Sequence, residues 1–328
     1  MKVGIVFAGQ GAQYPGMGKD LYDNFERAKE IFDHAGKEVE DWCFEGTKEM
    51  LRQTHITQPC IYTVTMAAYK AFMEAAEQEG LLEKMDVVGL AGFSLGEYAA
   101  LTVAGTIDEI GKGLEIVQKR GGLMQEAGMD AEGNPKGGMA AAFGHRDAIL
   151  KTIDGCVQGR ILEGVNFNSP VQTVVAGEKE ALEDFLVAAK ENKIKAKLLS
   201  VSTAFHSKMM EPAAAELYDI LLEAKLKAPT QKVYSNVTAK DMMAEFDGGD
   251  VSAYIAQRMA QQAKSPVYWQ EIIENMVADG AEVIIEIGPG KTLSGLTKKI
   301  SESVKTLHVE NHESLEQTIA ALKEASTC

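Results

Sequence analysis

Short apolar runs recur along the chain and alternate with stretches of helical periodicity. The runs that predict strands lie at residues 3–7, 87–91, 139–143, 172–176, 197–201, 232–234 and 283–287. The predicted helices cover residues 59–79, 108–127, 178–192, 208–225 and 314–325. Alternation of strands with helices is typical of an α/β protein with a largely parallel sheet.

A loop rich in Gly, Asp and Asn at residues 128–135 interrupts this alternation. The pattern that follows it is β-α-β-β-α-β and ends near Val201, which is the order of a ferredoxin-like subdomain. We therefore predict a large α/β domain, residues 1–127 and 202–328, interrupted by a small insert at residues 128–201.

Composition limits the class of protein, its possible partners and the compartment in which we expect it. The chain has 328 residues, of which 45% are hydrophobic and 25% charged, as in ordinary globular proteins. A net charge of −15 argues against nucleic acid or an anionic membrane as a partner. No apolar run approaches the ~20 residues of a membrane span. The four cysteines form no Cys-x-x-Cys pair, so we expect reduced thiols in a cytoplasmic protein.

The sequence Gly92-Phe93-Ser94-Leu95-Gly96 directly follows a predicted strand and precedes a helix-forming stretch. Strand, glycine-flanked serine turn and helix form the context of a nucleophile elbow, although an ordinary strand-to-helix turn is the simpler alternative. The glycines let the chain turn sharply. The backbone N–H of Leu95, at the start of the helix, would face negative charge that develops beside Ser94.

Two other glycine motifs fail on spacing. Gly9-Gln10-Gly11 follows the first strand, but the third glycine of a dinucleotide loop would fall at Tyr14. Gly290-Lys291-Thr292 resembles the end of a P-loop whose first glycine would fall at Ile285. The six histidines show no metal-ligand spacing, so we expect no metal site.

A serine nucleophile needs a base, and two histidines follow Ser94 in positions that suit one. His206 lies between the predicted strand 197–201 and the helix from residue 208, which favours a loop at the C-terminal edge of the sheet. His308 lies in a final apolar run, where a structural histidine is more common. Sequence position favours His206 and leaves His308 open.

Arg120 falls on the apolar side of the predicted helix 108–127, beside Ile116, Leu123 and Met124. Its head could escape to water along the helix surface. Alternatively, a buried guanidinium could grip a carboxylate with two parallel hydrogen bonds. The periodicity alone does not choose between them.

Over essentially its whole length the chain resembles the malonyl-CoA:acyl carrier protein transacylases. The matching segments are Phe7-Ala8-Gly9-Gln10-Gly11-Ala12-Gln13, Gly92-Phe93-Ser94-Leu95-Gly96-Glu97-Tyr98, Arg120-Gly121-Gly122-Leu123-Met124-Gln125, Ala204-Phe205-His206-Ser207, Ser235-Asn236-Val237, Gln262 with Ser265-Pro266-Val267, and Gly288-Pro289-Gly290-Lys291. The resemblance implies a hydrolase-like α/β domain with a ferredoxin-like insert, which agrees with the division above.

The resemblance also implies roles for single residues. It makes Ser94 the nucleophile and His206 the base, the latter oriented by a main-chain carbonyl rather than an acid. The backbone N–H groups of Gln10 and Leu95 would form the oxyanion hole, and Arg120 would bind the malonyl carboxylate. The remaining implied site residues are Gln262 as active-site support, and Phe93, Phe205 and Asn236 as substrate contacts. Phe205 would crowd an α-methyl branch and so favour malonyl over methylmalonyl.

Phe93 departs from the resemblance, because the family most often has histidine before the nucleophile. This residue is not the base, since His206 fills that role. The polar contact to substrate that the usual histidine makes is therefore in question here, and we expect Phe93 to affect acyl preference or rate.

The implied reaction is ping-pong transfer from malonyl-CoA to the phosphopantetheine thiol of acyl carrier protein, without a bound cofactor and by a monomer. Carrier proteins of this kind are acidic, so docking would need local positive charge. The candidate clusters are Lys193, Lys195 and Lys197, and Lys291, Lys298 and Lys299. The sequence leaves open whether the pathway makes fatty acids or polyketides.

Three rival functions fit parts of the pattern. A thioester hydrolase on the same fold would not need Arg120. A plain esterase would need an acid after Ser94 and would make His308 the base. A non-catalytic module that docks carrier protein would need none of the site residues, which are nevertheless present.

Overall fold

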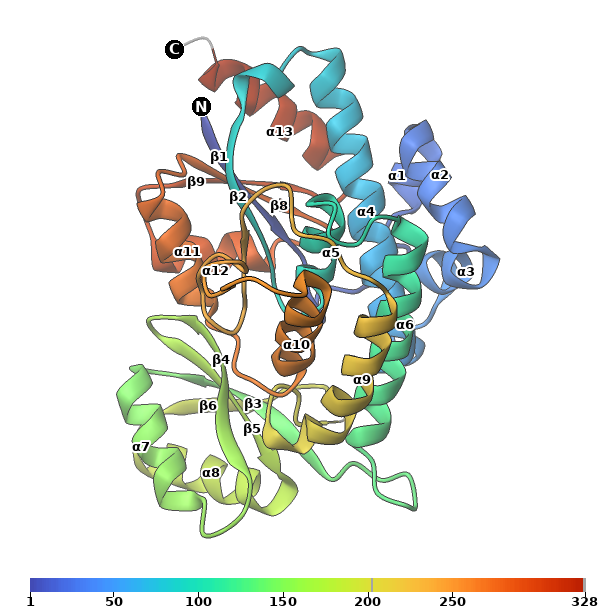
Figure 1. The fold of residues 1–328 in the computed structure, drawn as a ribbon. Helices are drawn as coiled ribbons and strands as arrows, with labels where there is room; N and C mark the ends of the chain where they lie inside the picture. Colours follow the sequence, from blue (N-terminus) through green and yellow to red (C-terminus); the bar gives the residue numbers. More distant parts are fainter. Residues whose placement is uncertain (202, 327–328) are drawn as a thin grey trace.

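The large domain is built on a five-stranded parallel sheet in the order β7-β2-β1-β8-β9 (Figure 1). The computed structural model describes residues 1–201 and 203–326. The strands are β1 (Lys2–Phe7), β2 (Asp86–Gly92), β7 (Val233–Tyr234), β8 (Val283–Ile287) and β9 (Lys305–Val309). The α/β class that the alternating pattern predicts is confirmed.

Helices cover both faces of this sheet, as a parallel sheet requires. They are α1 (Lys19–Asn24), α2 (Glu26–Ala35), α3 (Lys37–Glu45), α4 (Thr54–Gln78), α5 (Gly96–Val103), α6 (Ile110–Ala127), α9 (Glu211–Glu223), α10 (Val251–Ala263), α11 (Trp269–Ala278), α12 (Thr292–Ile300) and α13 (His312–Ala325). Single turns of 3₁₀ helix lie at Met50–Arg52, Leu82–Lys84 and Lys208–Met210.

Alternate side chains of β1 enter two separate cores, because successive strand residues point to opposite faces. Ile5 and Phe7 pack into the larger core, which includes α4, while Val6 packs with Trp269 of α11 on the other face. The sheet is thus buried on both sides, which favours the ends of its strands as the place for a ligand.

The second sheet has four antiparallel strands in the order β4-β5-β3-β6. Its elements are β3 (Gly137–Phe143), α7 (Arg146–Cys156), β4 (Leu162–Ser169), β5 (Gln172–Glu178), α8 (Lys179–Glu191) and β6 (Lys195–Leu198). This order is the predicted ferredoxin-like one, and a core of its own lies between sheet and helices. In Figure 1 the unit projects from one end of the large domain.

The structure describes only one of the two predicted boundaries of the insert. The expected loop at residues 128–135 does join α6 to β3, with an isolated bridge between Met129 and Pro135. The expected return falls at position 202, which lies outside the described residues. The domain limits therefore stay a proposal.

Two predicted elements differ from the structure. The strand predicted at residues 197–201 is β6, which covers Lys195–Leu198 and pairs at the edge of the small sheet. The helix predicted from residue 59 begins at Thr54 and has Pro59 inside it. Residues 54–58 are largely buried, so tertiary packing extends the helix past its proline, and Gln58 becomes helical. Over residues 1–201 and 203–326, no helix is both long and apolar enough to cross a bilayer.

Candidate active site

Ser94 occupies a sharp turn between β2 and α5. Its φ of 51° lies in the left-handed region, which a non-glycine residue adopts only under constraint. A Cβ on Gly92 would lie 1.9 Å from the carbonyl carbon of Gly96, and one on Gly96 would lie 2.2 Å from the carbonyl oxygen of Phe7. Neither flanking position has room for a side chain, so both must be glycine. The local geometry is that of a nucleophile elbow.

His206 meets the serine at hydrogen-bond distance. Its Nε2 lies 2.7 Å from Ser94 Oγ, and its Nδ1 lies 2.9 Å from the main-chain oxygen of Gln262. Burial, reinforced by the charge of Arg120, lowers the pKa of His206 to about 4. The imidazole is thus neutral near pH 7, with Nδ1–H donating to the carbonyl and Nε2 free to accept the serine proton.

His206 follows the last strand of the small sheet. We predicted a loop after the strand 197–201, which closes the predicted insert, and the preceding strand is β6 of the small sheet. Further along the chain, His206 lies beside Ser94 of the large domain.

Arg120 projects from α6 into the same site and is 1% exposed, which excludes the snorkelling alternative. Nη1 donates to Gln58 Oε1 at 2.8 Å, and Nη2 donates to Gln262 Oε1 at 3.0 Å and to Ser94 Oγ at 3.1 Å. Among the described residues, no carboxylate forms a salt bridge with this guanidinium. Burial lowers the pKa of Arg120 from its usual range.

A cavity of about 400 Å³ opens over these side chains. It lies between the two units, because residues of β3 and β4 contribute to its lining. Its lining includes Gln10, Tyr14, Lys48, Arg52, Gln58, Phe93, Ser94, Arg120, Asn166, Phe205 and His206. Within residues 1–201 and 203–326, the backbone N–H groups of Gln10 and Leu95 donate to no protein acceptor. An oxyanion formed beside Ser94 could use such donors.

Asn236 lies behind the serine turn rather than in the cavity. Its Oδ1 accepts from the backbone N–H of Ser94 and its Nδ2 donates to the carbonyl of Gly92, each at 2.7 Å. The side chain is fully buried and is not part of the cavity lining. Its placement therefore differs from the expected substrate contact, and it braces the backbone of the turn instead.

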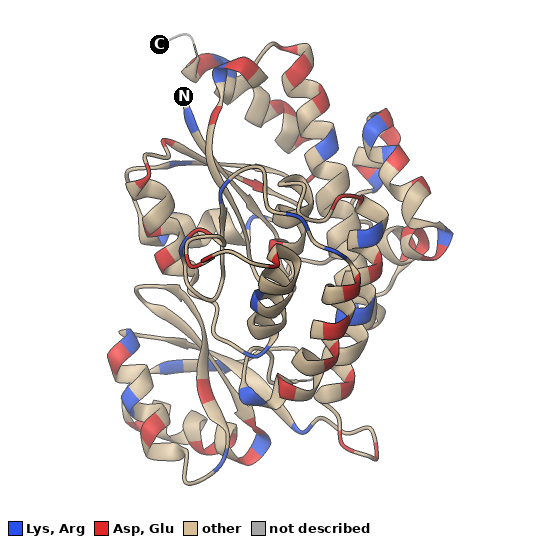
Figure 2. Ribbon diagram, in the orientation of Figure 1, with Lys and Arg blue, Asp and Glu red and all other residues tan. Residues whose placement is uncertain are grey.

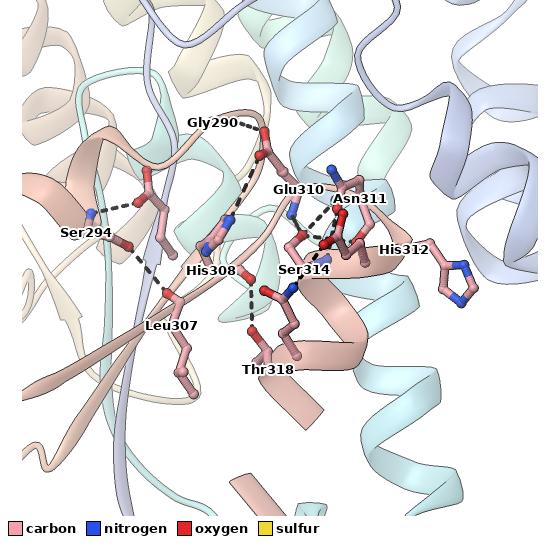
Figure 3. A network of polar contacts seen from close by, with 12 residues as sticks. Gly290, Ser294, Leu307, His308, Glu310, Asn311, His312, Ser314 and Thr318 are labelled. Atoms are coloured by element: carbon pink, nitrogen blue, oxygen red, sulfur yellow. Dashed lines mark hydrogen bonds and ion pairs between the residues drawn. The ribbon is translucent and has the colours of Figure 1, made fainter. Parts of the chain in front are cut away.

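His308 lies on β9, in a separate polar network (Figure 3). Its Nε2 is 3.9 Å from Glu310, whose carboxylate also accepts from the backbone N–H of Gly290 and from the Tyr14 hydroxyl. Ser94 is not in this network, so the structure does not join His308 to the serine. Across the described ranges, no group of three His, Cys, Asp or Glu side chains could hold a metal ion.

Three site residues were not found from the sequence. Gln58 holds Arg120, Glu97 is buried behind the serine turn, and Asn166 of β4 lines the cavity with no hydrogen-bond partner for its Oδ1 in the described chain. Glu97 lies in the segment 92–98 that carries the resemblance but was given no role there, and its other signal is a charge in an otherwise apolar stretch. Gln58 and Asn166 carry no such signal, because both depend on contacts between distant segments.

Comparison with known proteins places this geometry in context. The model of the acyl transferase domain family matches residues 5–321. The malonyl CoA-acyl carrier protein transacylase of Bacillus subtilis is 38% identical over 98% of each chain. The crystal structure of malonyl CoA-acyl carrier protein transacylase from Clostridium perfringens has a TM-score of 0.88 and 38% identity, covering 100% of this chain and 99% of the other.

A second similar structure contains two proteins. It holds a malonyl-transacylase in complex with its type II PKS acyl-carrier protein. The matched chain has a TM-score of 0.87 and 33% identity, covering 98% of this chain and 100% of the other.

Proposed function

This chain belongs to the acyl transferase family, and on that premise we propose that it transfers a malonyl group from malonyl-CoA to the phosphopantetheine thiol of an acyl carrier protein. Ser94 carries the group between the two thiols as an ester. His206 is the general base and acid, and Arg120 holds the free carboxylate of the malonyl group.

The observation that carries this proposal is a buried cation beside the nucleophile that, among the described residues, no carboxylate contacts directly. Arg120 is held by neutral oxygens of Gln58 and Gln262, and its Nε has no acceptor within the described residues. A buried charge is costly unless it is paired. A malonyl carboxylate supplies the missing partner, with the geometry that a guanidinium grips best. An acetyl group would leave the cation unpaired, so the site selects against it.

In the first half-reaction, Ser94 Oγ attacks the thioester carbonyl carbon while its proton passes to His206 Nε2. The backbone N–H groups of Gln10 and Leu95 stabilise the oxyanion, and loss of one such donor typically costs about 3 kcal/mol of barrier. The C–S bond then breaks and the CoA sulfur takes the proton from His206. A malonyl-serine ester remains.

In the second half-reaction, the carrier-protein thiol gives its proton to His206 and its sulfur attacks the ester carbonyl. The C–O bond to Ser94 breaks, and Ser94 recovers its proton from His206. The two thiols use the same site in turn, which gives ping-pong kinetics. Phe205 lines the cavity next to the base, so we propose that it crowds an α-methyl branch and favours malonyl over methylmalonyl.

Two exposed groups of lysines are proposed to receive the acidic carrier protein. Figure 2 shows basic residues both on the small unit and on α12. The first group is Lys193, Lys195 and Lys197, and the second is Lys291, Lys298 and Lys299. The first precedes residues 199–201, which line the cavity. Charge reversal of either group should slow transfer to carrier protein without slowing ester formation from malonyl-CoA; unchanged transfer after reversal of both would contradict this docking.

The proposed place of the reaction is the cytoplasm. The three cysteines that the structure describes, Cys43, Cys60 and Cys156, are free and buried thiols. Such thiols suit a reducing compartment.

The test of the proposed function separates transfer from hydrolysis. The protein is loaded with malonyl-CoA, then mixed with phosphopantetheinylated carrier protein, and both malonyl-carrier protein and free malonate are measured. We expect transfer to exceed hydrolysis and to vanish in Ser94→Ala. Rapid release of free acid without transfer would instead favour an acyl-thioester hydrolase on the same fold.

A further inference from the structure

Glu97 is a buried carboxyl group that the proposed reaction does not use. It lies in the first turn of α5, three residues after Ser94, and is fully buried. Its Oε2 accepts from Gln262 Nε2 at 2.9 Å, and its Oε1 accepts from the backbone N–H of Asn236 at 3.2 Å. One side chain thus contacts both residues that hold the serine turn from behind.

The charge state of Glu97 follows from these contacts. Burial raises the pKa of this carboxyl to about 8, while the bonds from Gln262 and Asn236 and the charge of Arg120 oppose that rise. Both oxygens accept hydrogen bonds from N–H donors. A pKa of about 8 by itself would leave the group protonated at neutral pH, but the two accepted hydrogen bonds suit the ionised form, which can only accept.

The amide of Gln262 joins Glu97 to Arg120. Nε2 donates to Glu97 and also to the main-chain oxygen of Ser94, the latter at 2.7 Å. Oε1 accepts from Nη2 of Arg120. The amide must present its nitrogen to two acceptors and its oxygen to the guanidinium, and the opposite orientation would direct its NH₂ at a cation that can only donate.

From this arrangement we infer that Glu97 is a positioning residue that sets the orientation of the Gln262 amide and, through it, the position of the carboxylate-binding Arg120. The inference deepens the proposed function and rests on it. Glu97 itself touches neither the substrate nor the reacting atoms. Its effect is on selection of the acyl group, through the guanidinium.

Glu97→Gln isolates this role because it keeps the shape and adds two donors. The backbone N–H of Asn236 is fixed in place, so the amide oxygen of the new glutamine must take the position that accepts its hydrogen bond. The new NH₂ then faces Gln262 Nε2, which places donor against donor unless the Gln262 amide turns over. Either result disturbs the acceptor that Arg120 uses, and a small displacement at a positioned group can cost about 100-fold in rate.

The matched control is Glu286→Gln. Glu286 is another buried carboxylate, 1% exposed, and it accepts from two backbone N–H groups, those of Leu293 and Ser294. It lies on β8 and is not part of the cavity lining. Glu286→Gln therefore reports the general cost of removing a buried acceptor, without an effect on the site.

The measurement is kcat/KM for ester formation on Ser94 with malonyl-CoA and with acetyl-CoA. We expect Glu97→Gln to lower the preference for malonyl over acetyl at least tenfold, and Glu286→Gln to leave that preference as in the wild type. If Glu97 had a merely structural role, kcat/KM would fall in parallel for malonyl-CoA and acetyl-CoA as folded protein is lost. An unchanged preference in Glu97→Gln, whether both rates fall together or neither falls, would overturn the inference.

Gln262→Met provides a second route that does not depend on folding of the Glu97 variant. It removes the side-chain amide and keeps the main-chain oxygen that holds His206. We expect the same loss of preference, and we expect the double variant to match Gln262→Met, because Glu97 acts through Gln262. A retained preference in Gln262→Met, or a further loss in the double variant, would refute the coupling. A wild-type chain that shows no malonyl preference would overturn the proposed function itself, and this inference with it.

Discussion

Arg120 donates a hydrogen bond from Nη2 to the hydroxyl oxygen of Ser94 at 3.1 Å. The same oxygen lies 2.7 Å from Nε2 of His206, so the cation and the base share one atom. The charge of Arg120 is one of the two causes that lower the pKa of His206, after burial. A substrate carboxylate on Arg120 would offset that charge and make His206 a stronger base as the acyl group arrives.

The acid limb of the pH profile tests this relationship. Because the pKa of His206 is lowered to about 4, the neutral base persists well below neutral pH. We expect kcat/KM with acetyl-CoA to stay level from pH 7 to about pH 5 and to fall as His206 gains a proton near pH 4. Arg120→Met removes one cause of the lowering, so the midpoint should move upward. A midpoint that is unchanged in Arg120→Met would show that burial alone sets it.

The same group links folding to pH. An unfolded His206 takes up a proton near pH 6.5, whereas the folded one does so near pH 4. The unfolded chain therefore binds more protons between these values, and His206 makes stability fall as the pH drops from 6.5 to 4. Denaturant titrations should show a shallower fall over this window in His206→Gln than in the wild type. Parallel curves would mean that His206 is not buried as a neutral group.

Asn236→Ala should act on the turn and not on substrate binding. It removes the partners of two buried backbone groups, Ser94 N–H and Gly92 C=O, and each such orphan costs about 1–3 kcal/mol. We expect a lower free energy of unfolding and a lower kcat, with KM for malonyl-CoA little changed. A raised KM with normal kcat would instead support the substrate contact that the family resemblance implied for Asn236.

Phe93→His introduces the residue that the family resemblance leads us to expect before the nucleophile. The Phe93 ring packs edge-on against Trp269, with ring centroids 5.3 Å apart, so the change should cost about 1 kcal/mol of stability. Because His206 remains the base, we expect ester formation on Ser94 to stay within about tenfold of the wild type. His206→Ala with Phe93→His should stay inactive, and recovery of activity in that double variant would contradict our assignment of the base.

Gly92→Ala should break the serine turn. Its Cβ would lie 1.9 Å from the carbonyl carbon of Gly96, and backbone at that position cannot move aside cheaply. We expect a loss of about 3 kcal/mol or more of unfolding free energy and no ester on Ser94. Gly155→Ala is the matched control, since it lies on α7 with no atom within 4 Å of the added Cβ. An active, stable Gly92→Ala protein would exclude the elbow geometry.

Local signals in the sequence predicted much of the fold. Apolar runs locate the strands of the parallel sheet, and the glycines around Ser94 predict its turn, because each depends on near neighbours in the chain. The misplaced strand near residues 197–201 shows the limit. Its apolar end belongs to the cavity lining around Leu199 and Val201 and not to a sheet, and periodicity cannot distinguish these two kinds of burial.

Contacts between distant segments at the site were harder to predict from the sequence. The apolar side of α6 raised the question of Arg120, but only the fold shows that Gln58 and Gln262 hold it from two other helices. The bond from His206 to the main-chain oxygen of Gln262 has no residue-type signature at all. The buried contacts of Glu97 and Asn236 could not be predicted either, because they too join segments that are distant in the sequence.

The central claim is that Arg120 selects the malonyl group that Ser94 carries. It is tested most directly by intact mass of the protein after incubation with equal concentrations of malonyl-CoA and acetyl-CoA. We predict one malonyl ester on wild-type protein, none on Ser94→Ala, and loss of the malonyl preference in Arg120→Met. Equal labelling of the wild type by both acyl groups, or an undiminished malonyl preference in Arg120→Met, would contradict the account.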